Sequence, residues 1–170
     1  MELFEAIAKR HSYRGPYLDK PVPREDLRKI VQAGIQAPSA RNAQSTSFVI
    51  VDDPEVMNHL REIVPISAPA AIVCVVDPSP VVHGKSFELE DCAAAVENML
   101  LAITTLGYAS VWLEGVLHGG RAEQVAELLG VPPSKRVQVI LPVGVPAENW
   151  QQREKKPFEE RAWFNHYGGS

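Results

Sequence analysis

One stretch constrains the fold more than any other: residues 88–107, ELEDCAAAVENMLLAITTLG, carry the strongest helix signal in the chain. The stretch is rich in Ala and Leu, which favour helix, and Gly107 is a natural C-terminal stop. Its apolar face is too wide for a helix that covers only one side of a small protein. We therefore expect this helix to run through the centre of the domain or of a dimer.

Shorter segments, separated by turn residues, lie on both sides of this helix. Residues 70–77 are almost continuously apolar, as in a strand that is covered on both faces. A chain of 170 residues is the size of one domain with a single core, so we expect residues 1–170 to form one domain. Periodicity and turn signals predict helices at 2–9, 24–36, 54–64 and 121–129, and strands at 48–53, 70–77, 109–114 and 136–145.

Composition argues against several classes of protein. With 45% hydrophobic and 22% charged residues the chain is an ordinary folded protein, and its net charge of −4 argues against a general nucleic-acid binder. Cys74 and Cys92 lie in apolar runs and the five histidines form no ligand pattern, so we expect core cysteines and no metal. No apolar run approaches the roughly 20 residues that span a bilayer, and the N-terminal residues lack signal-peptide features. We expect a cytoplasmic protein with no membrane segment.

The segment 10-RHSYRGPYLDKPVP-23 places the guanidinium groups of Arg10 and Arg14 on either side of Ser12. Two cations at this spacing repel each other, so folding gains nothing from gathering them unless an anion lies between them. A phosphate group is the natural candidate. The alternative is a solvated helix end whose arginines pair with surface acids.

Two loops carry groups that suit a planar heterocycle. In 37-APSARNAQSTSF-48, the amides of Asn42 and Gln44 can both donate and accept hydrogen bonds, although Pro, Ser and Asn are also ordinary loop residues. In 112-WLEGV-116, Gly115 would let the backbone approach a flat ligand closely. A strand end followed by a tight turn explains the second segment equally well.

Two later segments are less specific. In 141-LPVGVP-146, Pro142 and Gly144 interrupt an apolar strand, which fits a bulge, exposed backbone near a ligand, or an edge strand. In 153-REKKPFEE-160, three bases precede a proline, either as a solvated charge run or as a second arm of the phosphate site. In the second case both ends of the chain would meet over one anion.

The tail, residues 146–170, carries five of the chain's twelve aromatic residues but little periodicity. A segment this apolar needs a surface to pack on, and in so small a protein a partner subunit can provide it. The five aromatic residues are Trp150, Phe158, Trp163, Phe164 and Tyr167.

In their order and spacing these motifs resemble the nitroreductase-like family of FMN-dependent oxidoreductases. The shared pattern is Arg-x-Ser-x-Arg after the first helix, Ala-Pro-Ser-x-x-Asn-x-Gln after the second, Glu-Gly after a middle strand and a basic pair before a late proline. The resemblance covers nearly the whole chain. It implies an α+β, three-layer fold with a mostly antiparallel central sheet flanked by helices. It also implies an intertwined homodimer with two FMN molecules at the subunit interface, the long helix as dimer axis and the tail around the partner.

The same resemblance assigns binding residues in three groups. One group would hold the FMN phosphate and ribityl chain, a second would line the isoalloxazine from the partner subunit, and a third would lie at the reactive edge of the flavin. In that order, the groups are Arg10, His11, Ser12, Arg14, Arg153 and Lys155; Pro38, Ser39, Asn42 and Gln44; and Glu114 and Gly115. Many relatives continue Asn-x-Gln with Pro-Trp, whereas Ser45 and Thr46 follow here, a difference that bears on the substrate pocket.

The implied activity is hydride transfer from NADH or NADPH through flavin N5 to an electron-poor small molecule such as a nitroaromatic or a quinone. No side chain need act as a nucleophile, and positioning is the main catalytic contribution. Arg41 and Arg14 are both candidates for the cation that stabilises reduced flavin near N1. Two alternatives stay open: a non-catalytic flavin store or sensor, and a protein that binds another phosphorylated metabolite.

Overall fold

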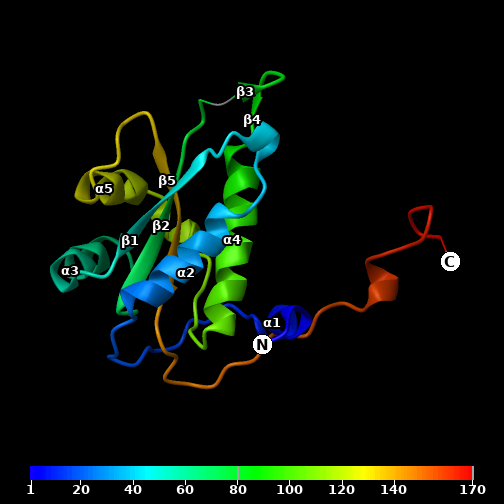
Figure 1. Cartoon of the computed structure of the whole chain (residues 1–170), viewed down its shortest axis with the longest axis horizontal. Helices are drawn as coiled ribbons and strands as arrows, with labels where there is room; N and C mark the ends of the chain where they lie inside the picture. The colour runs from blue at the N-terminus through cyan, green and yellow to red at the C-terminus, as the bar shows by residue number, and fades with distance from the viewer. Residues whose placement is uncertain (80, 170) are drawn as a thin grey trace.

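The computed structural model describes residues 1–79 and 81–169, and it has an antiparallel sheet between two layers of helices (Figure 1). The sheet has the order β1-β2-β5, with bounds Thr46–Val51, Ala70–Val76 and Arg136–Val143. Every residue of β2 is buried, as the continuous apolar run predicts for a central strand. The expected three-layer α+β architecture is therefore confirmed.

Each face of the sheet is covered by a pair of helices. On one face α2 (Arg24–Ile35) and α4 (Glu88–Thr105) enclose a core with Ile72, Cys74 and Leu141. On the other face α3 (Pro54–Ile63) and α5 (Arg121–Leu128) cover the alternate residues of the same strands. The remaining helix, α1 (Leu3–Lys9), precedes these layers and contacts α4.

The long helix α4 packs against α2 and one face of the sheet, so within one chain it lies in an outer layer and not at the centre; its expected place at the centre of a dimer stays a prediction. It ends where the sequence indicates, because Gly107 adopts a φ of 82°, a conformation that suits glycine. Cys74 and Cys92 are buried free thiols beside each other, and their contact and burial raise the pKa of Cys74. They are core residues, as predicted.

The expected strand at 109–114 is wrong as a regular strand. This segment lies beside β5, where Leu113 and Ile140 exchange backbone hydrogen bonds of 3.1 and 2.9 Å and the Ala109 N–H donates to Gly144. Pro142 falls midway between these pairs and has no N–H to donate, so the ladder is reduced to isolated bridges. The other side of Pro142 pairs with β2.

Gly144, which interrupts the same strand, is explained by packing within the chain. A Cβ there would lie 2.6 Å from Pro69 Cδ and 2.8 Å from Tyr17 Cδ1. Neither a ligand nor an edge position is needed to account for this glycine, since β5 has a neighbour on both sides.

The connections contain short elements that periodicity does not predict. The loop after β2 forms a two-residue hairpin, β3 and β4, and three single turns of 3-10 helix occur at η1, η2 and η3. Their bounds are Val81–Val82, Lys85–Ser86, Ala40–Asn42, Gly115–Leu117 and Phe158–Glu160. In the part of the chain that is described, no helix is both long and apolar enough to cross a bilayer.

Candidate functional site

The N-terminal cationic group consists of Arg10 and Arg14 with His11 and Ser12 between them. It follows α1 and lies against residues 108–115, which we call the edge segment. The Tyr13 N–H donates to the Ser110 carbonyl at 2.9 Å, which fixes the two segments side by side. The Arg10 side chain is only 20% exposed, with Nε 3.5 Å from a carboxylate oxygen of Glu97 on α4. Arg14 is exposed, and no carboxylate pairs with it in the described part of the chain.

Of the two smaller members of this group, His11 lies beside α4. His11 lies in contact with the C-terminal half of that helix, and its Nδ1 is 2.9 Å from the Lys9 carbonyl oxygen. Because a carbonyl oxygen only accepts, Nδ1 is the donor in this contact. Ser12 is half-buried between the two arginines.

The C-terminal arm reaches the same place. The Gln152 amide donates to the Arg10 carbonyl, and the Trp150 ring packs edge-on against Tyr13 with centroids 5.3 Å apart. Arg153 follows Gln152 directly and Lys155 lies two residues further on, and both are exposed. The structure thus brings the start of the C-terminal arm, at Gln152, to the N-terminal segment at Arg10.

Four basic residues, Arg10, Arg14, Arg153 and Lys155, lie within four residues of the Gln152–Arg10 contact along the chain, on a protein whose net charge is −4. Among residues 1–79 and 81–169, only the first of them has a carboxylate partner, and that pair is long. Such a group of cations is the usual way to hold a phosphate, because charge-assisted hydrogen bonds offset the mutual repulsion.

The edge segment leads from this cationic group to Gly115. Five residues of extended chain separate Ser110 from Gly115, a span of about 16 Å, comparable to the length of a mononucleotide. At its far end the Glu114 carboxylate accepts a hydrogen bond of 2.9 Å from the Gln138 amide of β5. This contact fixes the carboxylate beside the sheet.

Gly115 has no structural reason to be glycine within this chain. Its φ is not positive, and a Cβ built on it meets no atom within 4 Å. An open position with ordinary backbone accepts alanine unless something outside the chain lies against it. The site thus has cations at one end and bare backbone at the other, which fits a phosphate joined to a flat ring.

The loop of residues 37–45 lies elsewhere, beside the first turn of α4. Pro38, Ser39 and Gln44 line a groove of about 400 Å³ between α2, α4 and β1. The Thr46 hydroxyl in the same groove is buried without a hydrogen-bond partner among the described residues. Asn42 is exposed and does not line this groove.

Arg41, in the middle of this loop, points towards His83 and not towards the N-terminal cationic group. Its guanidinium donates to Nε2 of His83 at 2.9 Å, on the turn between β3 and β4. In this arrangement Arg41 is held at the N-terminal end of α4, whereas Arg14 belongs to the cationic group.

The loop and the cationic group lie at opposite ends of α4. The loop contacts Asp91, and the Arg10 and His11 side chains lie beside Thr104. Asp91 and Thr104 are thirteen residues apart, about 20 Å along the helix, and the Arg10 guanidinium reaches back to Glu97, six residues or about 9 Å from Asp91. One chain therefore does not bring its own loop onto its own cationic group, and a single chain presents each half separately.

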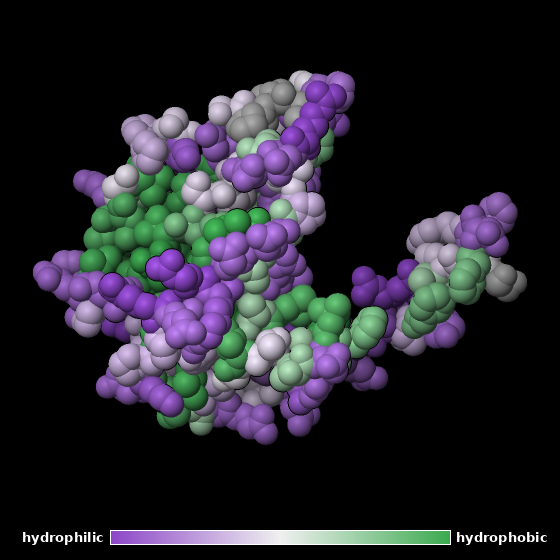
Figure 2. Space-filling view, in the orientation of Figure 1, coloured by the Kyte–Doolittle hydropathy of each residue, from purple (hydrophilic) through white to green (hydrophobic). Residues whose placement is uncertain are grey.

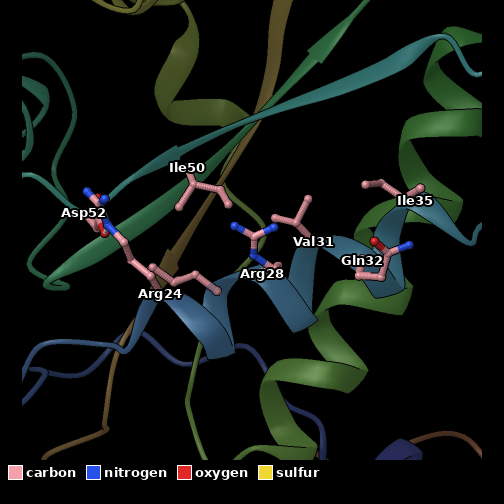
Figure 3. Close-up of a pocket in the computed structure, with 8 residues that line it drawn as sticks. Arg24, Arg28, Val31, Gln32, Ile35, Ile50 and Asp52 are labelled. Carbon is pink, nitrogen blue, oxygen red and sulfur yellow. Dashed lines mark hydrogen bonds and ion pairs between the residues drawn. The ribbon is translucent and has the colours of Figure 1, made fainter.

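A second groove, of about 460 Å³, lies between α2 and β1 and contains none of the expected site residues (Figure 3). Arg24 points across one end of it and forms a paired contact with Asp52, whose pKa is lowered mainly by this hydrogen bond. Ile35 and Ile50 line it and are 55% and 38% exposed. Figure 2 shows a hydrophobic area beside α2 in this region, along the free edge of β1.

Sequence reasoning missed two residues that organise these regions. Gln152 ties the C-terminal arm to Arg10, and a glutamine before a basic run carries no local signal. Asp91 holds the loop, and the one available signal was an acidic residue followed by an apolar run at the start of the helix.

Comparison with known proteins places the fold and the sequence in one family. A model of the Nitroreductase family matches residues 7–74 and 67–145. An Archaeoglobus fulgidus protein assigned as an NADH dehydrogenase/NAD(P)H nitroreductase is 35% identical over 96% of this chain and 94% of its own. The crystal structure of a protein with the same assignment from Parabacteroides distasonis superposes with a TM-score of 0.83 at 29% identity, covering 96% and 98% of the two chains. The chain belongs to the nitroreductase family.

Two further relatives are named for their cofactor. An FMN-dependent nitroreductase of Clostridium difficile has a TM-score of 0.82 at 25% identity, over 96% of this chain and 99% of its own. An NADPH-flavin oxidoreductase of Vibrio harveyi is 28% identical over 86% of this chain and 67% of its own.

Proposed function

We propose that this protein is an NAD(P)H-dependent flavin oxidoreductase whose FMN lies along the edge segment, with its phosphate among the cations and its ring beside Gly115. One observation carries the proposal: Gln152 joins the C-terminal arm to Arg10 at one end of an edge segment whose other end, at Gly115, is bare backbone. The names of the Clostridium difficile and Vibrio harveyi relatives support the cofactor and the reductant.

The residues of this chain would bind and orient the cofactor. Bound FMN supplies the redox chemistry, accepting hydride from the nicotinamide and delivering it to an electron-poor acceptor. Arg14, Arg153 and Lys155 would hold the phosphate by charge-assisted hydrogen bonds. The backbone at Gly115 would lie against the reactive edge of the ring, and its N–H is a donor available there.

The loop is the proposed cover of the ring, contributed by a second subunit. In one chain it lies about 9 to 20 Å along α4 from the N-terminal cationic segment, but two antiparallel α4 helices related by a twofold axis would bring each loop to the other chain's edge segment. Arg41, carried by that loop, is then better placed than Arg14 to stabilise the reduced ring near N1, because Arg14 lies with the phosphate.

The C-terminal tail supports a homodimer as the working unit. Beyond Gln152 it extends away from the rest of the chain (Figures 1 and 2), and Phe158, Phe164 and Tyr167 are 58%, 74% and 92% exposed. Aromatic side chains this exposed are stabilised when a second surface covers them. The apolar groove at the free edge of β1 is one surface on a partner that could receive them.

The visible spectrum of the purified protein tests the cofactor, and anaerobic mixing with NADH or NADPH tests the activity. We expect a yellow protein that bleaches with the reductant and recovers its colour when a quinone or nitroaromatic is added. A yellow protein that does not bleach would instead be a flavin store or sensor. A colourless protein that binds no added FMN would favour another phosphorylated metabolite.

Mixed dimers test whether the site is shared. Arg14→Ala damages the cationic group, and a variant with Ser39→Trp would block the loop, so each homodimer should bind FMN poorly. If every site takes its cations from one subunit and its loop from the other, a mixed dimer contains one intact site and one doubly damaged site. Recovered flavin binding on mixing supports the shared site, and no recovery in verified mixed dimers contradicts it.

A further inference from the structure

Asp91 is a buried carboxylate that the proposed chemistry does not use. It lies in the first turn of α4, is 7% exposed, and borders the groove lined by Pro38 and Ser39. Its two oxygens accept from the Ala40 N–H at 2.9 Å and from the Ser45 hydroxyl at 2.7 Å. A buried carboxylate is retained at low cost only when it is fully hydrogen-bonded, and both of its bonds go to one loop.

The segment between these two contacts is strained. Arg41, Asn42 and Gln44 have φ values of 50°, 58° and 50°, in the left-handed region that residues with side chains rarely adopt. Three internal hydrogen bonds span parts of the loop: the Gln44 N–H donates to the Ser39 hydroxyl at 2.9 Å, and the Asn42 and Ala43 N–H groups donate to the Ser39 and Ala40 carbonyls at 2.9 and 3.0 Å. Strained backbone persists where the surrounding structure imposes it. Here Asp91 accepts hydrogen bonds from Ala40 and Ser45, which lie on either side of the strained residues.

We propose that Asp91, through Ser45, is the positioning residue that sets the shape of the flavin-covering loop. This inference rests on the proposed function, because the loop carries the residues expected to line the ring. It also gives a role to Ser45, whose hydroxyl is the side-chain donor to the Asp91 carboxylate. In this chain the loop is fixed by a hydroxyl–carboxylate contact.

Four variants separate positioning from general stability. Asp91→Ala removes both contacts, and Ser45→Ala removes one and leaves the carboxylate its bond to Ala40. Asp91→Asn can keep both, since its oxygen accepts from the Ala40 N–H and its amide donates to the Ser45 oxygen. Glu90→Ala removes an exposed charge from the same helical turn without touching the loop, so it is the matched control.

The measurements are FMN titration of the apo-protein by flavin fluorescence, the visible spectrum of bound flavin, and a thermal melt of the apo-protein. We expect Asp91→Ala and Ser45→Ala to weaken FMN binding at least about tenfold, which is 1.4 kcal/mol, and to shift the visible band. Asp91→Asn should stay within about threefold of the wild type, and Glu90→Ala should match it. If Asp91→Ala does not fold, Ser45→Ala alone decides.

The outcomes distinguish this inference from the proposed function. If the wild-type apo-protein takes up no flavin, the proposed function and this inference are both wrong. If the wild type binds FMN and Ser45→Ala binds it equally well with the same spectrum, whatever its melting temperature, only the positioning role is wrong. If Asp91→Asn binds as poorly as Asp91→Ala, the charge matters rather than the hydrogen bonds, and the positioning role is again wrong.

Discussion

Replacing Gly115 by alanine separates two explanations of one residue. If glycine serves the fold, a side chain must strain the backbone or clash, and the protein loses stability. The structure predicts neither, because the φ of Gly115 is not positive and an added Cβ meets nothing within 4 Å. If instead the backbone lies against a flavin ring, the added methyl group pushes on the ring and binding suffers.

The expected magnitudes have opposite signs in the two assays. Alanine at a compatible position reduces the freedom of the unfolded chain and stabilises by roughly 0.4–1 kcal/mol. For a chain of this size that raises the apo-protein Tm by about 1–4 °C. Overpacking against a rigid ring costs about 1–3 kcal/mol, so FMN affinity should fall by roughly 5- to 150-fold.

Gly107→Ala is the matched control, since this glycine also has open space but adopts a φ of 82°. It should lose about 1–2 kcal/mol of stability and keep its flavin affinity. Calorimetric titration with FMN and a thermal melt of each apo-protein give both quantities. A Gly115→Ala protein that melts early, fills with FMN normally and is reduced by NAD(P)H at the wild-type rate would refute the reasoning.

Three further changes probe the rest of the site and the fold. Arg14→Ala removes a charge-assisted contact, so FMN should bind more weakly by about 1.5–3 kcal/mol in calorimetry, and unchanged affinity would contradict its role. Deleting residues 153–170 keeps Gln152 on Arg10 but removes Arg153, Lys155 and the rest of the tail, so ultracentrifugation should show loss of the dimer and the visible spectrum should show loss of flavin; a yellow dimer would contradict both. The Tyr108 hydroxyl donates to Asp26 at 2.7 Å, and burial with this contact raises the pKa of Tyr108 to about 12, while the same bond lowers the pKa of Asp26. Tyr108 therefore contributes fully to the free energy of unfolding below pH 10 and loses this contribution towards pH 12, whereas the contribution of Asp26 is lost below pH 4. Tyr108→Phe should flatten both the acid and the alkaline limb of a plot of Tm against pH. Unchanged limbs would count against the contact.

The sequence predicts those elements whose signal is local. The long helix and the strand at 70–77 follow from continuous apolar patterns, and Gly107 marks a stop that any helix of this composition needs. The helix starting at Arg24 is found within one residue because its acidic first turn and apolar stripe lie together in the chain.

What the sequence leaves open depends on contacts between distant residues. The edge segment is broken by Pro142, about thirty residues further along the chain, so its own β pattern could not reveal the isolated bridges. Gly144 is small because of Pro69 and Tyr17, and the loop is held by a carboxylate 46 to 51 residues away. Contacts between residues that are distant in the sequence cause all three features, so no local sequence pattern predicts them.

The arrangement also explains why the expected site residues do not share an enclosed cavity in one chain. The cations and Gly115 lie along one edge of the sheet, while the loop lies at the other end of α4 and lines a different groove. If a second copy closes the site over a ring, as proposed, the exposed aromatic tail gives that copy apolar surface to bury. In such an arrangement FMN contacts both chains, so cofactor binding and subunit association stabilise each other by mass action. Under that linkage a change confined to the loop weakens flavin binding in the partner, even though the loop is distant from the cations of its own chain.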